Sequence, residues 1–242
     1  MLVFPQAMKV FIRLLAVFVF LGVAAHAQTT IYWNFSTGTG SPNSLSANVS
    51  GAVIAGQNGD LLYTPAFDTV NPSGGYSGAS GVHNASIEVN AVAGPVTLAN
   101  LNTATYFEFT VAPDPGYSLQ ATDFQLGSRS KFANGPSTVT LVASTDGFTT
   151  FSTLGTATLA PNNNWTLVTL SSFSYSAAID VPIAFRIYGT DGSGGLPVSN
   201  WRIDDVTLGI VAVPEPSTYA SLLVGVVLMG ARSLRRRKSA VA

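Results

Sequence analysis

Short runs in which apolar and polar residues alternate dominate the middle of this chain and leave few folds open to it. In "YFEFTV", Phe107, Phe109 and Val111 fall on one face of an extended segment. The runs "STVTLVAS" and "VPIAFRIYG" repeat the period of two, and Gly, Pro, Asn and Asp separate such runs. Because no stretch between the two ends sustains a helical period, the pattern predicts an all-β body.

Further runs of this kind cover Thr30–Phe35, Ser86–Val92, Ser118–Leu126 and Trp165–Leu170. Roughly eight to eleven strands in one layer would leave a wide apolar face in water, so two packed sheets are expected. We therefore predict a two-sheet β-sandwich, jelly-roll-like, over residues 28–212.

The last strand-like run, "NWRIDDVTLGI", changes its phase in the middle. Trp201 and Ile203 share one face, whereas Val206 and Leu208 fall on the other parity. The slip at Asp204–Asp205 predicts a β-bulge that turns two adjacent carboxylates toward a strand edge.

Two interpretations of these carboxylates stay open. In the first, Asp204 and Asp205 hold a structural Ca²⁺ together with oxygens such as those of Asn34 or Ser36 from the first strand. In the second, one carboxylate pairs with a base such as Arg186 and the other is solvated.

Charge and cysteine content exclude several classes of function. Between Gln28 and Val213 four basic residues face eleven acidic ones, a net charge of −7, so we expect no nucleic-acid partner. The chain has no cysteine, which excludes a disulfide framework and thiolate chemistry.

Residues suited to catalysis are sparse in the middle of the chain. His83, its one histidine, lies in a Gly/Ser-rich loop. A glycan hydrolase needs only two carboxylates, and Glu88 and Glu108 are candidates, although both read as solvent-facing strand acids. We predict that the protein is not an enzyme and keep an extracellular hydrolase as an alternative.

Exposed aromatic residues are the candidates for binding glycan, because rings stack on the C–H faces of sugars. We select Tyr76 and Phe132, which we expect to be exposed in loops, and Trp165, which follows the polar loop "PNNN". Trp201 lies in an alternating run and is expected in the core. Arg129 and Lys131 form a basic pair that either meets an acidic sugar or makes a turn soluble.

The N-terminal residues 1–27 have the layout of a secretory signal helix. Lys9 and Arg13 precede the apolar stretch Leu14–Ala25, and small residues allow cleavage after Ala27. A membrane anchor that stays attached is the alternative.

The C-terminus has three parts: a short motif at 213–218, an uncharged segment at 219–231 and a basic tail at 232–238, followed by residues 239–242. The uncharged segment would span roughly 20 Å as a helix, against a bilayer core of about 30 Å. It is therefore predicted to be a short transmembrane helix whose basic tail stays cytoplasmic. The basic residues of that tail are Arg232, Arg235, Arg236, Arg237 and Lys238.

This C-terminus closely resembles the PEP-CTERM sorting signal of Gram-negative bacteria that make exopolysaccharide. Pro214, Glu215 and Pro216 match its signature. The resemblance implies export across the inner membrane, transient anchoring there, processing by an exosortase, and a final place at the cell surface or in the extracellular matrix. An ordinary C-terminal anchor is the alternative.

The segments "IDDV" and "YWNF" also resemble, more loosely, the last and first strands of jelly-roll carbohydrate-binding and adhesion modules. In those modules the acid helps to hold a structural Ca²⁺. Taken together, the sequence predicts a non-enzymatic surface or matrix protein associated with exopolysaccharide. A carbohydrate-binding module with a structural calcium is the first alternative.

Overall fold

The structure is a computed structural model that describes residues 29–45, 47–51, 53–58, 66–69, 71–195, 200–215 and 225. The predicted signal segment 1–27, Pro216, the basic tail 232–238 and, apart from Gly225, the uncharged segment 219–231 lie outside these residues. Within the described part of the chain, no helix has the length and apolar character needed to cross a membrane.

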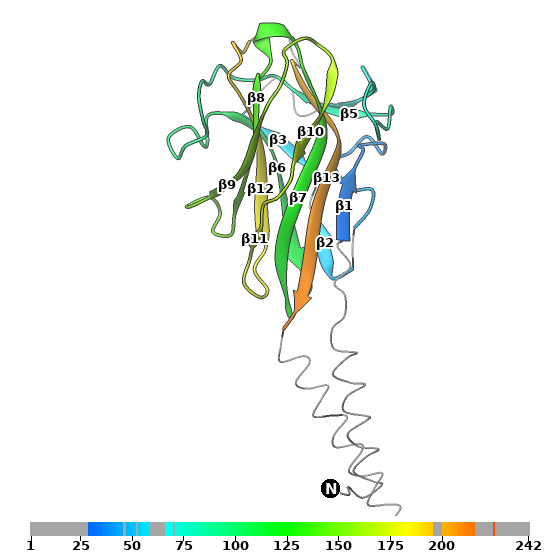
Figure 1. Cartoon of the computed structure of the whole chain (residues 1–242), viewed down its shortest axis with the longest axis vertical. Coiled ribbons are helices and arrows are strands. Elements are labelled where there is room, and N and C mark those ends of the chain that lie inside the picture. Colours follow the sequence, from blue (N-terminus) through cyan, green and yellow to red (C-terminus); the bar gives the residue numbers. More distant parts are fainter. Residues whose placement is uncertain are drawn as a thin grey trace, which may run out of the picture. The chain divides into compact units, whose positions relative to one another are not determined.

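One antiparallel sheet, sheet A, is built around two long strands (Figure 1). Its strand order is β10-β7-β13-β5-β4, with β1 pairing with β13 and β11 pairing with β7. The strands are β1 (Thr29–Trp33), β4 (Ala66–Asp68), β5 (Asn84–Ile87), β7 (Tyr117–Ser130), β10 (Trp165–Leu170), β11 (Tyr175–Ser176) and β13 (Trp201–Pro214).

The second antiparallel sheet, sheet B, has the order β2-β6-β12-β8-β9, with β3 pairing with β6. Its strands are β2 (Val49–Gly51), β3 (Ala55–Gln57), β6 (Thr105–Pro113), β8 (Thr138–Ser144), β9 (Ser152–Thr158) and β12 (Ile183–Thr190). A short 3₁₀ turn, η1 (Phe132–Asn134), follows β7.

The core lies between the two sheets and consists of the inward residues of the alternating runs. Phe185 of β12 lies opposite Phe109 of β6, and their rings stack with centroids 5.1 Å apart. Trp33 of sheet A reaches the same Phe109 with a centroid distance of 4.9 Å. The sandwich of two sheets is therefore confirmed, because the alternating residues of both sheets meet in one apolar layer.

The predicted bulge in β13 is confirmed. Trp201 and Ile203 on one side of it, and Val206 and Leu208 on the other, are all fully buried. Before the bulge β13 pairs with β5, and after it with β1. Asp205 has a φ of +49°, an uncommon conformation for a residue with a side chain.

The sequence pattern missed the short strands β2, β3, β4 and β11 and the edge strand β9. Each of the first four has two or three residues, too few to display alternation. β9 has the sequence "STLGTAT", in which Thr and Gly blur the contrast between the inner and outer faces.

Part of the outer face of sheet B carries a second, smaller apolar cluster. The guanidinium of Arg186 lies 4.2 Å from the ring centre of Tyr106 and 3.8 Å from that of Phe148. It also forms an ion pair with Glu108 at 2.6 Å. The predicted alternative in which Arg186 pairs with Asp204 or Asp205 is therefore wrong, because Arg186 lies on the other sheet and bonds Glu108.

Candidate functional site

The carboxylate of Asp205 is the centre of a dense set of hydrogen bonds, which we call the diacid site together with Asp204. Its Oδ1 accepts from the hydroxyl of Tyr32 at 2.6 Å. Its Oδ2 accepts from the hydroxyls of Tyr76 at 2.6 Å and Ser73 at 3.1 Å, and from the backbone N–H of Ser80 at 3.0 Å. Burial and the bond to Asp205 raise the pKa of both tyrosines. These hydroxyls therefore stay protonated donors.

Asp204 lies fully buried beside Asp205. Its Oδ1 accepts from the backbone N–H of Asp205 at 2.7 Å, and its Oδ2 accepts from the hydroxyl of Ser80 at 3.2 Å. Burial, and to a lesser degree the charge of Asp205, raises the pKa of the Asp204 carboxyl to about 7. Ser80 thus bonds both carboxyl groups, through its N–H and its hydroxyl.

The donors Ser73, Tyr76 and Ser80 all belong to the Gly/Ser-rich loop before β5. The ring of Tyr76 lies directly on Gly127 of β7, where a Cβ would overlap the ring end. A residue without a side chain is therefore required at position 127 for Tyr76 to reach Asp205. The Gly/Ser-rich loop is thus fixed on the bulge by these bonds.

In the described part of the chain, no hydrogen bond joins the predicted calcium ligands of the first strand, Asn34 and Ser36, to the carboxyl groups of the diacid site. Asn34 lies one step away, bonded to the Tyr32 hydroxyl that donates to Asp205. Asn34 Oδ1 accepts from the backbone N–H of Ser36 at 3.0 Å, and Ser36 Oγ accepts from Asn43 Nδ2 at 2.9 Å. Among the described residues no group of three or more His, Cys, Asp or Glu side chains is placed to hold a metal ion. Ca²⁺ binding stays a prediction, and a cation at Asp205 would have to replace donors that the carboxylate already accepts.

The three aromatic candidates for glycan binding lie in different settings. Tyr76 is half-buried with its hydroxyl on Asp205, so the expectation that it is exposed is wrong. Phe132, in η1, is 57% exposed, as expected. Trp165, in β10, is half-buried, and its Nε1 donates to the backbone oxygen of Asn71 at 3.2 Å.

Trp165 has a basic neighbour, Arg129, which the sequence suggested either for contact with an acidic sugar or for a soluble turn. In the register of β10 and β7, Trp165 lies opposite Arg129. Arg129 is 9% exposed, and its guanidinium donates to Asn163 through Nε (2.8 Å to the backbone oxygen) and Nη2 (2.5 Å to Oδ1). Burial, and then the charge of Arg202, lowers the pKa of Arg129.

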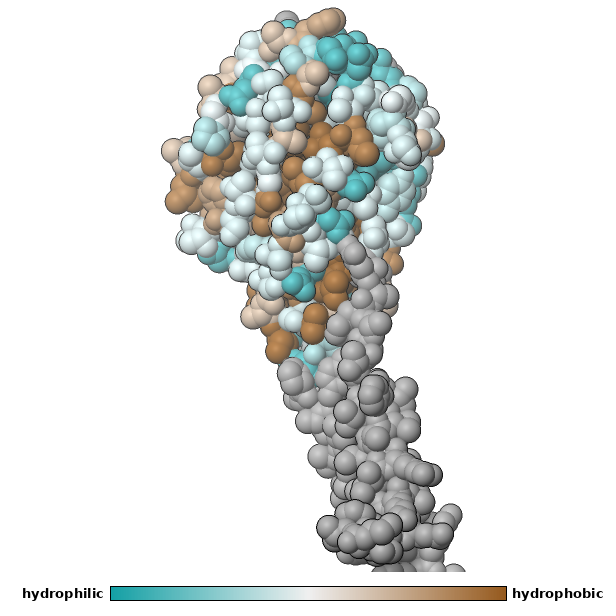
Figure 2. Space-filling view, viewed as in Figure 1, coloured by the Kyte–Doolittle hydropathy of each residue, from teal (hydrophilic) through white to brown (hydrophobic). Residues whose placement is uncertain are grey.

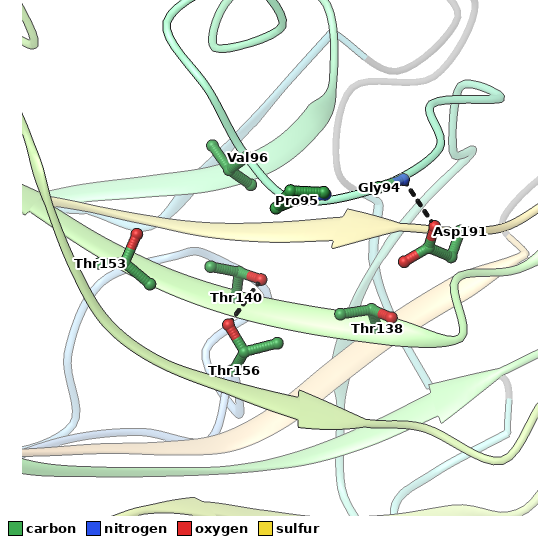
Figure 3. A pocket seen from close by; sticks show the side chains of 8 residues that line it. All are labelled: Gly94, Pro95, Val96, Thr138, Thr140, Thr153, Thr156 and Asp191. Carbon is green, nitrogen blue, oxygen red and sulfur yellow. Dashed lines mark hydrogen bonds between the residues drawn. The ribbon is translucent and has the colours of Figure 1, made fainter.

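A pocket of about 240 Å³ opens on the outer face of sheet B and is lined by the segment Gly94–Val96 and by threonines of β8 and β9 (Figure 3). The carboxylate of Asp191 closes one end and accepts from the N–H of Gly94 at 2.7 Å, which lowers its pKa. Hydroxyl groups that both donate and accept suit a polyol, but no aromatic ring lines this pocket. Its floor carries Thr138, Thr140, Thr153 and Thr156.

The carboxylates considered for hydrolysis do not converge. Glu88 follows β5 of sheet A and is buried, with 6% exposed. Glu108 belongs to β6 of sheet B and bonds Arg186. The expectation of a solvent-facing strand acid is wrong for Glu88, which is buried, whereas Glu108 lies in a strand with 35% of its side chain exposed and pairs with Arg186.

The C-terminal end of β13 runs into the segment singled out by its Pro-Glu-Pro sequence. Pro214 is the last residue of the strand, and Ser118 Oγ donates to the backbone oxygen of Val213 at 3.3 Å. A family model described as the PEP-CTERM protein-sorting motif matches residues 212–238. This chain carries a PEP-CTERM sorting motif. The PEP-CTERM motif implies an exported protein that is anchored transiently and sorted to the surface, and it begins within the last strand of the sandwich.

Comparison with solved structures finds small β domains. The C-terminal domain of a chitobiase from Bacteroides fragilis shares 18% identity over 45% of this chain, with a TM-score of 0.27, and the match covers 65% of that domain. CBM35 from Cellvibrio japonicus Abf62 shares 12% identity over 77% of this chain and 99% of its own, with a TM-score of 0.36. The K3 cleaved adhesin domain of Lys-gingipain from Porphyromonas gingivalis shares 16% identity over 74% and 98%, with a TM-score of 0.32. No curated protein matches the chain in sequence.

Proposed function

We propose that this chain is a non-enzymatic surface or matrix protein. An exosortase processes it, and its β-sandwich associates with exopolysaccharide. The observation that carries the proposal is the PEP-CTERM motif at 212–238, which follows the sandwich without a linker, since Pro214 still belongs to β13. Sorting by such a motif delivers the β-sandwich to a compartment where polysaccharide is the abundant polymer.

The state of the charged groups supports a role without catalysis. A hydrolase needs a carboxyl group whose oxygens can reach the substrate. Asp205 accepts four bonds from the protein, and Glu108 accepts from Arg186. Glu88 is buried in the segment that follows β5 of sheet A. Asp205 and Glu108 are thus bonded to a loop and to a neighbouring strand, and none of these three acids lines the pocket beside Asp191.

The test follows the protein in its native host. Replacing Pro214, Glu215 and Pro216 by alanine is expected to leave an unprocessed chain in the inner membrane and to remove the protein from the exopolysaccharide fraction. A matched control replaces Ser217 and Thr218, which follow the signature, and is expected to leave sorting unchanged. Sorting that survives the triple alanine change would overturn the proposal.

The hydrolase alternative has its own measurement. Purified protein incubated with the host's exopolysaccharide is expected to release no reducing ends. Release that a Glu88→Gln or Glu108→Gln change abolishes would establish the alternative and remove the non-enzymatic assignment.

A further inference from the structure

We propose that Arg129 and Trp165 form a binding site for a sugar that carries a carboxylate, such as a uronic acid unit of a polysaccharide. The inference rests on the proposed association with exopolysaccharide and names the class of sugar and its place on the domain. The site lies on sheet A, where β10, β7 and β13 run side by side (Figure 1).

Arg129 has donors to spare although it is nine-tenths buried. A guanidinium carries five N–H donors. Within the described part of the chain two of them bond Asn163, and both acceptors there are neutral oxygens. No bond from Nη1 to a described residue is found, and 9% of Arg129 stays exposed. A carboxylate at Nη1 would supply the opposite charge that these bonds do not.

The surroundings of Arg129 favour an anion in spite of the acidic domain. Of the four bases between Gln28 and Val213, only Arg186 lies on sheet B, where it pairs with Glu108. Arg202 adds positive charge beside Arg129, and Lys131 lies two residues further along the chain. Three of the four bases therefore gather near the ends of β7 and β13.

The flank beside the site carries no opposing charge. From residue 147 to residue 179, which includes β9, β10 and β11, the sequence has no charged residue. Figure 2 shows the face of the domain that is seen in Figure 1. Pale residues of intermediate hydropathy and brown apolar residues cover most of this face. A polysaccharide acid that approaches Arg129 over β10 thus meets no carboxylate from these strands, so repulsion from the rest of the domain is weakened by distance and screening.

Trp165 supplies the surface for the sugar ring. Residues directly opposite in an antiparallel pair have their Cβ atoms about 5 Å apart, close to the width of one sugar ring. A ring stacked on the indole would therefore place its carboxylate within reach of the guanidinium opposite. The bond from Trp165 Nε1 to Asn71 fixes the indole, so less side-chain freedom is lost on binding.

The experiment compares two polymers with the same sugar backbone: polygalacturonate, which carries carboxylates, and its fully methyl-esterified form, which carries neutral esters instead. The exported protein, purified with its C-terminal segment in mild detergent, is tested by affinity gel electrophoresis and calorimetry. We expect about tenfold tighter binding to the acid than to the ester at low salt, with the preference shrinking as salt rises. Equal affinity for both polymers would overturn the inference.

Variants assign the preference to Arg129. Arg129→Gln is expected to lose most of the tenfold preference for the acid while it binds the ester as before. Arg129→Lys is expected to keep part of the preference, because the charge remains although the planar guanidinium is lost. Lys131→Gln removes the same charge two residues away and is expected to change binding by less than about threefold. Trp165→Ala should weaken binding to both polymers. Equal losses in Arg129→Gln and Lys131→Gln would mean unspecific attraction and would contradict the site.

Two further readouts separate the possible failures. The melting temperature of each variant shows whether it is folded. If Arg129→Gln does not fold, the comparison of the two polymers is made with Arg129→Lys instead. Wild-type protein that binds the host's exopolysaccharide but neither polymer, or both equally, overturns this inference alone. Wild-type protein that binds neither polymer nor the host's exopolysaccharide overturns the proposed function as well.

Discussion

The hydroxyl of Tyr76 donates to Oδ2 of Asp205 at 2.6 Å, across 129 positions of sequence. This bond ties the Gly/Ser-rich loop to the bulge in the last strand. It forms only because the Tyr76 ring lies on the bare backbone of Gly127.

Gly127→Ala should release the loop, because the new methyl group overlaps the Tyr76 ring and pushes its hydroxyl away from Asp205. Overpacking and the lost bond together are expected to lower the free energy of unfolding by about 2–4 kcal/mol, measured by urea denaturation. Gly74→Ala is the matched control in the loop, since a Cβ there meets nothing within 4 Å. Equal stability of both variants would contradict the arrangement of Tyr76 and Gly127.

Tyr76→Phe and Tyr32→Phe each remove one donor from Asp205 and keep the aromatic ring. Loss of a hydrogen bond to an ionised group is expected to cost about 1.5–3 kcal/mol in each variant. Because both donors serve one carboxylate, the double variant should depart from additivity in a double-mutant cycle. Strict additivity would mean that the two tyrosines act independently of Asp205.

Stability should fall as the pH rises toward neutrality, because of Asp204. The pKa of Asp204 is about 7 in the fold against an ordinary 3.8, so between these values the folded chain keeps a proton that the unfolded chain has lost. The contribution of Asp204 is therefore fully present below pH 4 and is lost as the pH passes 7, a change of about 1–4 kcal/mol.

Asp204→Asn is the control for this pH effect, since the amide imitates the protonated acid. Urea denaturation between pH 4 and 8 should give a flatter curve for the variant. Asp146 and Asp191, whose pKa values are lowered, lose their contributions only below this window. A variant with the same slope as the wild type would show that Asp204 does not titrate as described.

Calcium should not change the melting temperature if the protein donors keep Asp205 satisfied. The comparison uses protein dialysed against chelator and protein in millimolar Ca²⁺, with Mg²⁺ as the control. A rise in melting temperature that is specific to Ca²⁺ and absent in Asp205→Ala would show that the cation displaces those donors. The predicted Ca²⁺ site with Asn34 and Ser36 requires this displacement.

The alternating residues made the sandwich predictable, and the phase slip between Ile203 and Val206 located the bulge. The partners of Asp204 and Asp205 were not predictable, because they come from a loop whose Gly/Ser composition has no period and whose docking depends on Gly127 in a distant strand. The pairing of Arg186 with Glu108 likewise requires knowing that β12 lies beside β6. Strand adjacency is set by packing of the whole domain, which local pattern does not contain.

The same limit applies to the glycan candidates. Trp165 was identified from the polar loop before it, but its position opposite Arg129 follows from the β10–β7 register. Tyr76 looked exposed because its loop is polar, whereas its hydroxyl serves a buried carboxylate.

Mass spectrometry of both termini of the protein recovered from the host's exopolysaccharide tests the central claim most directly. The account predicts a chain that begins at Gln28 and lacks the basic tail 232–238, with the sandwich intact. A chain recovered there with both ends intact, or full-length protein found in the cytosol and none in the exopolysaccharide, would contradict it.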